Sequence, residues 1–141
     1  MSIDVGNALI GIVGVLVGAI IQYSLTKRAE QTKHLRELRT SAYVDFIRAV
    51  AGIATSGKHN DAARQLEYTI LLADAKARIA IYGDTRVVAA AAQFFRGTSA
   101  LHTPEEMDAF LKIVAAMRSS AAGKLALPEA DLSQLLFSRQ K

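Results

Sequence analysis

Two clusters of basic residues are the groups in this chain that could bind an anion. The first comprises Lys76, Arg78, Arg86 and Arg96, and Asp84 is the only acid between the first and last of them. The four residues lie in two expected helices, over 61–82 and 85–96. If these helices are antiparallel, the four side chains would form one positive patch. Such a patch suits a phosphate-bearing ligand, because guanidinium groups bind phosphate in a bidentate manner. The alternative is a solvated helix face, which is the usual position of such charges.

The second basic cluster directly follows a long uncharged run. It comprises Lys27, Arg28, Lys33, Arg36 and Arg39, with His34 among them. Basic residues next to a membrane span set its orientation and contact anionic lipid headgroups. The cluster therefore indicates a juxtamembrane segment.

Catalytic and metal-binding patterns are not found in the sequence. There is no Cys, which excludes a thiolate nucleophile, a disulfide or a Cys-ligated zinc. The phosphate-binding loop, the dinucleotide-binding motif and the H-E-x-x-H motif do not occur. His34, His59 and His102 are scattered and lack ligand spacing. We expect neither an enzyme, nor a cofactor, nor a metal site.

The uncharged run from Val5 to Leu25 has the length of a membrane span. Its 21 residues would extend about 30 Å as a helix, which matches the hydrocarbon thickness of a bilayer. A cleaved signal peptide is the alternative, but the residues before the run include no Lys or Arg and the run is too long. The basic cluster after it places the C-terminal side in the cytoplasm. We expect a single-pass protein of the cell inner membrane with its N-terminus outside.

One face of this expected span combines small and polar residues. Stepping at 100° per residue, six residues fall in a sector of roughly 80°. They are Asp4, Asn7, Gly11, Gly14, Gly18 and Gln22. Small residues let helices approach closely in lipid, and Gly14 with Gly18 forms a GxxxG pair. The stripe predicts self-association, and a plain anchor is the alternative.

Helical periodicity continues through the rest of the chain. A first helix is expected over 30–53, a second over 61–82 with Leu66, Ile70, Ala73, Ala77 and Ala80 as its apolar stripe, and a third over 85–96. Gly83 suits a left-handed position after the second helix, and Asp84 an N-cap of the third.

The clearest start signal begins the helix that follows. Thr103, Pro104 and Glu106 form a capping box with proline at the first helical position. Gly123 ends that helix, and Pro128 opens a last short one through Phe137. No segment alternates with the period of a strand. The predicted fold is all-α: residues 1–26 form the transmembrane helix with a short external N-terminus, and residues 27–141 form a cytoplasmic bundle of four or five helices.

Three stretches of the chain resemble known small membrane proteins. They are the glycine-rich span followed by TKRAEQTKHLRELRTSAYVDFIRAV, then KARIAIYGDTRVVAAAAQFF and the closing DLSQLLF. The pattern is similar to many small bacterial single-pass proteins without an assigned activity. The layout also resembles membrane effectors of anti-phage defence of the Hailong type. That resemblance implies a homo-oligomeric channel that opens under the control of a nucleotide or nucleic-acid oligomer.

Two functions remain open on these grounds. The first is a homo-oligomeric membrane effector, in which Asp4 would ring the outer mouth of a pore and Gln22 the inner one. The second is a membrane-tethered scaffold without transport activity that recruits a cytoplasmic protein. Its docking face would be formed by Leu132, Leu135, Leu136 and Phe137, and the alternative for these residues is core packing.

Overall fold

Five helices make up the secondary structure of the described residues. The computed structural model describes residues 3–97, 101–123 and 128–137, with the backbone alone for residues 3–14 and 129. The helices are α1 (Ile3–His59), α2 (Ala62–Tyr82), α3 (Thr85–Arg96), α4 (Pro104–Ala122) and α5 (Glu129–Phe137). No strand occurs within those ranges. The all-α prediction is therefore confirmed.

The chain divides into two units, residues 1–36 and 37–141. Helix α1 contributes to both, and it contains the apolar run and the helix expected over 30–53 without a break. The helix continues beyond the end expected at residue 53 and stops at His59. Asn60 then has a φ of 55°, a conformation that Asn tolerates better than most residues.

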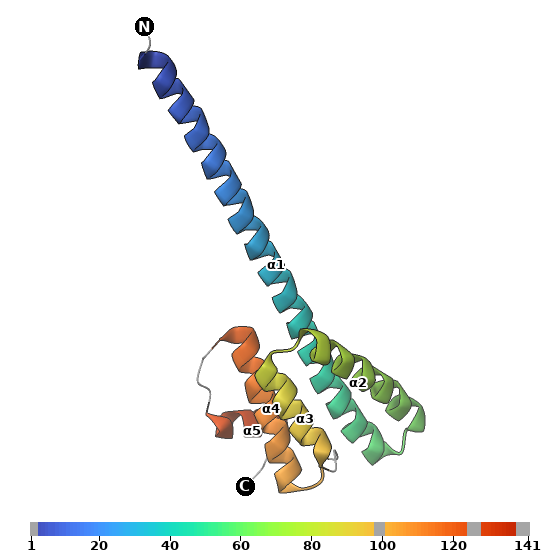
Figure 1. The fold of residues 1–141 in the computed structure, drawn as a ribbon. Coiled ribbons are helices and arrows are strands. Elements are labelled where there is room, and N and C mark those ends of the chain that lie inside the picture. Colours follow the sequence, from blue (N-terminus) through green and yellow to red (C-terminus); the bar gives the residue numbers. More distant parts are fainter. Residues whose placement is uncertain (1–2, 98–100, 124–127, 138–141) are drawn as a thin grey trace. The chain divides into compact units, whose positions relative to one another are not determined.

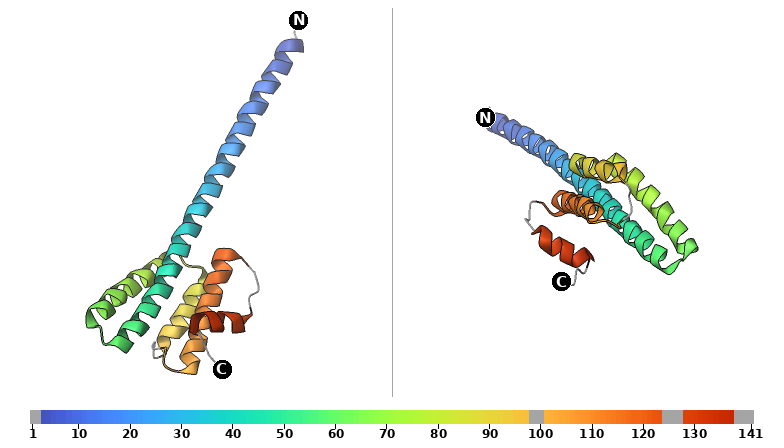
Figure 2. Two further views of the ribbon diagram at one scale, coloured as in Figure 1. Left: turned by 180° about the vertical axis from the view of Figure 1, so that it is seen from behind. Right: turned by 90° about the horizontal axis from the view of Figure 1, so that it is seen from below.

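The second unit is a helical bundle (Figures 1 and 2). The second half of α1 and α2 form an antiparallel hairpin, α3 and α4 form another, and α5 packs on α4. Its core contains the fully buried side chains Phe46, Val87 and Ile113. Phe110 stacks on Phe46 with 6.4 Å between the ring centroids. The predicted bundle is thus confirmed for this unit.

Local signals fix where the helices of the bundle begin. The Thr103 hydroxyl accepts the Glu106 N–H at 3.2 Å, and the Glu106 carboxylate accepts the Thr103 N–H at 3.0 Å. This is the predicted capping box. Asp84 accepts the Arg86 N–H at 2.9 Å and caps α3 as predicted.

Gly83 does not take the left-handed conformation predicted for it. Its φ of −62° and ψ of 153° are those of extended backbone. A glycine is still required, because a Cβ here would lie 2.3 Å from the carbonyl oxygen of Ile79. The turn from α2 to α3 therefore requires a glycine because the Gly83 Cα lies close to the Ile79 carbonyl oxygen, and not because of a positive φ.

The face of α2 that packs inward also differs from the prediction. The expected stripe of Leu66, Ile70, Ala73, Ala77 and Ala80 is exposed, with Leu66 and Ile70 each 63% exposed. Ala75 and Ile79 are buried instead. The ring of Tyr68 packs where a Cβ on Gly52 would lie, 2.4 Å away, and this contact fixes the rotation of α2 against α1.

Candidate functional site

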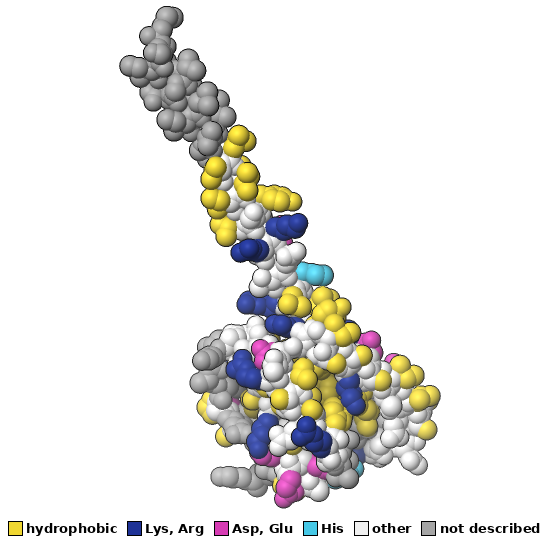
Figure 3. Space-filling view, in the orientation of Figure 1, with side chains coloured by type: hydrophobic (Ala, Val, Ile, Leu, Met, Phe, Trp, Pro, Cys, Tyr) yellow, Lys and Arg dark blue, Asp and Glu magenta, His cyan; other side chains and the backbone are white. Residues whose placement is uncertain are grey.

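The first unit presents a band of exposed apolar side chains. Seven large ones between Val15 and Leu25 are 50% to 73% exposed: Val15, Leu16, Val17, Ile20, Ile21, Tyr23 and Leu25. Figure 3 shows hydrophobic side chains on this stretch, followed along the helix by Lys and Arg. Gly18 has open space around the position of a Cβ, and Gln22 is exposed. The side chains of Asp4, Asn7, Gly11 and Gly14 lie outside the described residues.

Within the described residues, no helix has a stretch long and apolar enough to cross a membrane. Of the expected span, residues 5–25, the side chains of residues 5–14 lie outside the described residues.

The five basic residues predicted to lie next to a membrane fall into two groups by their surroundings. Lys27, Arg28, Lys33 and Arg36 are exposed on α1 of the first unit. Arg39 is half-buried in the second unit, where its Nε donates to the carbonyl oxygen of Tyr82. A cation at this position satisfies a carbonyl at the end of α2 and complements the helix dipole. Arg39 thus has a structural role that the sequence did not indicate.

The four residues of the predicted anionic-ligand patch have different partners. The ammonium of Lys76 lies 3.9 Å from the centroid of the Phe95 ring, and Arg86 pairs with Asp84 at 3.3 Å. Arg96 is exposed in the last turn of α3. Arg78 pairs with the carboxylates of Asp45 and Asp74, so its charge is already compensated. The contacts of these four residues do not join them into one open patch.

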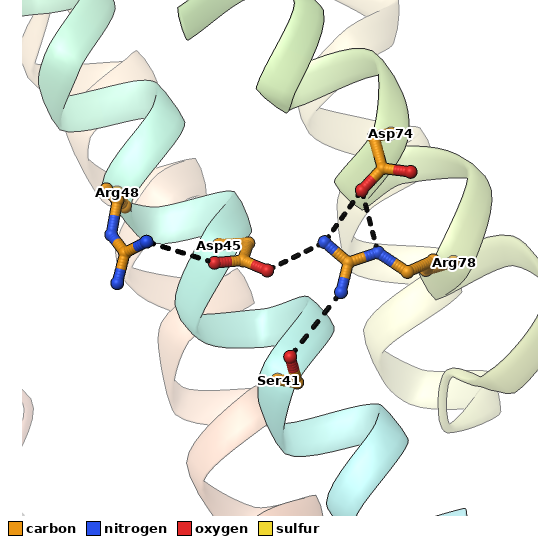
Figure 4. A network of polar contacts seen from close by, with 5 residues as sticks. All are labelled: Ser41, Asp45, Arg48, Asp74 and Arg78. Atoms are coloured by element: carbon orange, nitrogen blue, oxygen red, sulfur yellow. Dashed lines mark hydrogen bonds and ion pairs between the residues drawn. The ribbon is translucent and has the colours of Figure 1, made fainter.

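Arg78 connects α2 to α1 through a polar network (Figure 4). Its Nη2 lies 2.7 Å from Asp45 and 2.8 Å from Asp74, and its Nη1 donates to the Ser41 hydroxyl at 3.5 Å. The hydrogen bond to Asp45 raises the pKa of Arg78 above its ordinary value, with Asp74 adding to the effect against the opposing cost of burial. The network fixes the hairpin and leaves no anion site at Arg78.

A polar pocket of 370 Å³ lies between α1 and α2, near their connection. Three of its residues can be cationic, namely Arg48, His59 and Arg64, and one is acidic, Asp61; the other polar residues that line it are Thr55, Ser56 and Tyr68. Arg48 and Arg64 pair with Asp45 and Asp61, each at 3.4 Å, and their side chains are 63% and 73% exposed. Such loose exposed pairs contribute little energy and can exchange partners.

This pocket is the stronger candidate for an anionic ligand. Two guanidinium groups can bind phosphate oxygens in a bidentate manner, and a tyrosine ring offers an apolar face beside them. Sequence analysis missed it, because Arg48 lies on α1 and Arg64 on α2 and only the hairpin brings them together. His59 lines this pocket, whereas His102 lines a different one, so these two histidines are not gathered.

Comparison with protein-family models, with curated proteins and with solved structures finds no match to the chain.

Proposed function

We propose that the protein is a homo-oligomeric single-pass membrane effector whose cytoplasmic helical domain binds a phosphate-bearing ligand. The observation that supports this most directly is the band of exposed apolar side chains from Val15 to Leu25. Burying a large aliphatic side chain contributes about 1.5–3 kcal/mol. The six aliphatic side chains of this band in water therefore cost on the order of 10 kcal/mol relative to lipid.

The charges after this band support the proposed orientation. Lys27, Arg28 and Lys33 follow within two to three turns and are exposed. Basic residues of this kind remain on the cytoplasmic side of a span and attract anionic headgroups. The second unit would then be cytoplasmic and the N-terminus external.

Self-association is proposed to occur along the face of Asp4, Asn7, Gly11, Gly14, Gly18 and Gln22. Packing of small residues drives helix association in lipid. Ligand binding in the cytoplasmic domain would change the assembly if the ligand binds its closed and open states unequally. In the channel form of the proposal, a nucleotide or nucleic-acid oligomer at Arg48, His59 and Arg64 opens a pore.

Crosslinking in native membranes tests the assembly. The double variant Gly14→Ile with Gly18→Ile should lose the crosslinked oligomers. Gly6→Ile is the matched control, because at 100° per residue it lies about 120° from Gly18, outside the stripe, and should retain them. Unchanged crosslinking of the double variant would refute the interface.

Membrane insertion and conduction need separate measurements. The chain should float with lipid vesicles and resist extraction with alkaline carbonate, and release without detergent would refute the span. Cells that express the chain should take up a small dye or lose membrane potential, and cells that express the double glycine variant should do neither.

Ligand binding is tested with charge reversals. Arg48→Glu with Arg64→Glu should lose binding of a labelled oligoadenylate, whereas Lys112→Glu, a matched exposed cation on α4, should retain it.

The exposed face of α2 supports a second candidate function, a membrane-tethered scaffold. Leu66, Ile70, Ala73, Ala77 and Ala80 form an apolar stripe spaced alternately by four and three residues, as in helix pairing. The docking face expected on α5 has less support, because Leu132 is buried and only Leu135 is fully exposed. A chain that floats with lipid, captures a cytoplasmic protein through α2 and leaves the membrane potential unchanged would favour the scaffold over the channel.

A further inference from the structure

A second and larger pocket opens inside the bundle of the second unit. Its volume is 860 Å³, and all of its lining residues belong to residues 37–141. The second half of α1 and Leu72 of α2 form one side of it, the end of α3 another, and Leu101, Met107, Leu136 and Phe137 complete it. Arg48, His59 and Arg64, which line the polar pocket, do not line this larger pocket.

The floor of this pocket is an aromatic cluster. Phe94 and Phe110 are buried, with ring centroids 6.1 Å apart, and Phe137 lies 6.2 Å from Phe110. Burial of an apolar group against these rings would be favourable, because it removes apolar surface from water. The volume lies within the range of pockets that hold small apolar ligands. An apolar occupant is therefore expected.

The charges at the mouth specify the kind of occupant. Lys58 and His102 are the ionisable residues that line the pocket, and both are exposed. No Asp or Glu is present among its described lining residues. The nearby Glu106 carboxylate accepts the N–H groups of His102 and Thr103, and so serves the start of α4. The pocket thus combines an apolar interior with a rim that carries the Lys58 ammonium and the His102 imidazole.

We propose that this pocket binds a single-chain anionic amphiphile, with its acyl chain among the phenylalanines and its carboxylate or phosphate beside Lys58 and His102. The inference rests on the second unit and is independent of whether the first unit crosses a membrane. It also differs from the phosphate site proposed above, since that site lacks an apolar interior.

The test uses the full chain in amphipol and a photoactivatable hexadecanoate. The label should map to peptides that contain Phe94–Phe95, Met107–Phe110 or Leu136–Phe137. Excess hexadecanoate should displace it, and hexadecanol, which lacks the charge, should displace it at least tenfold less effectively. Each loss of two methylenes from the competitor should weaken it roughly tenfold. Label confined to residues 15–25, or equal competition by hexadecanol, would overturn the proposal.

Variants provide a second readout and a matched control. Lys58→Glu should weaken hexadecanoate at least tenfold, while Lys112→Glu, with the same change of charge on an exposed part of α4, should leave it unchanged. Ala54→Phe should fill the pocket and abolish labelling, with its fold checked by circular dichroism. If it does not fold, the chain-length series and Lys58→Glu still decide. Equal binding by the two Lys variants would overturn the assignment of the rim.

Competition also distinguishes the headgroups and the rival occupant. A lysophosphatidate of equal chain length that competes better than hexadecanoate identifies a phosphate headgroup, and the reverse identifies a free fatty acid; both outcomes support the proposal. A crosslink from pocket residues to a second copy of the chain that blocks labelling would overturn it in favour of a protein occupant.

Discussion

The Nη2 atom of Arg78 lies 2.7 Å from a carboxylate oxygen of Asp45, with the two side chains only 26% and 20% exposed. This ion pair joins α2 to α1 and is the least exposed one among the described residues. It has two consequences for the molecule. It fixes the rotation of α2, and it removes Arg78 from the set of cations available to a ligand.

Loss of this pair should destabilise the bundle. Arg78→Ala leaves Asp45 partly buried with only the loose contact to Arg48, and we expect a loss of about 1–2 kcal/mol in the free energy of unfolding. Arg48→Ala is the control, because its exposed contact with Asp45 should contribute less than about 0.5 kcal/mol. Denaturant unfolding followed by circular dichroism measures both. Equal losses in the two variants would contradict the assignment.

Two glycines should respond in opposite directions to the same substitution. Gly83→Ala places a Cβ 2.3 Å from the Ile79 carbonyl oxygen and should destabilise the turn from α2 to α3 by about 1–3 kcal/mol. Gly57→Ala lies within α1 and meets nothing within 4 Å, so it should stabilise the helix by up to about 1 kcal/mol. Thermal unfolding of both variants gives the comparison. A stabilising Gly83→Ala would show that the turn is made differently.

The cap of α3 should give the protein a pH-dependent element of stability. The hydrogen bond from the Arg86 N–H lowers the pKa of Asp84 below its ordinary 3.8, and the Arg86 side chain adds to this against the cost of burial. A carboxylate whose pKa is lowered by folding stabilises the fold above its unfolded pKa, and this contribution is lost as the pH falls through the folded value.

Asp84→Asn isolates this contribution, because an asparagine oxygen still caps the helix but does not titrate in this range. The wild-type chain should be more stable than the variant at neutral pH, and the difference should shrink as the pH falls below the ordinary 3.8 and vanish only below the lowered pKa of folded Asp84. Asp84→Ala should lose about 1 kcal/mol at neutral pH. Unfolding curves of the three proteins between pH 7 and pH 3 provide the test. A constant difference between wild type and Asp84→Asn would rule out the linkage.

Local signals explain which parts of this fold could be predicted. The start of α4 depends on Thr103 and Glu106, which lie three residues apart, and the start of α3 depends on Asp84 and its next neighbours. Such contacts form between residues two or three positions apart, so the local sequence is enough to predict them. Phe46 and Val50, four residues apart on α1, also follow helical periodicity, and both are buried.

The parts that could not be predicted depend on fitting one helix against another. Helix α2 has apolar residues on two faces, and periodicity alone cannot choose between them. The choice is made by Tyr68 packing on Gly52 and by Arg78 binding Asp45, two contacts between residues 16 and 33 positions apart. The same packing of α2 against α1 forms the polar pocket. Arg48 and Arg64 both line this pocket, although no sequence motif links them.

The rotation of α2 can be tested with polar substitutions on its two faces. Leu66→Ser with Ile70→Ser changes two side chains that are exposed, so the free energy of unfolding should change by less than about 1 kcal/mol. Ile79→Ala removes a buried side chain and should cost about 2–5 kcal/mol, because the surrounding bundle cannot fully close the cavity. Denaturant unfolding of the full chain in detergent measures both. If the serine pair proved the more damaging change, the stripe of Leu66 and Ile70 would be covered in the folded protein, by α1 or by a second copy. Dilution separates those two cases, since only an interface between copies would make the loss depend on protein concentration.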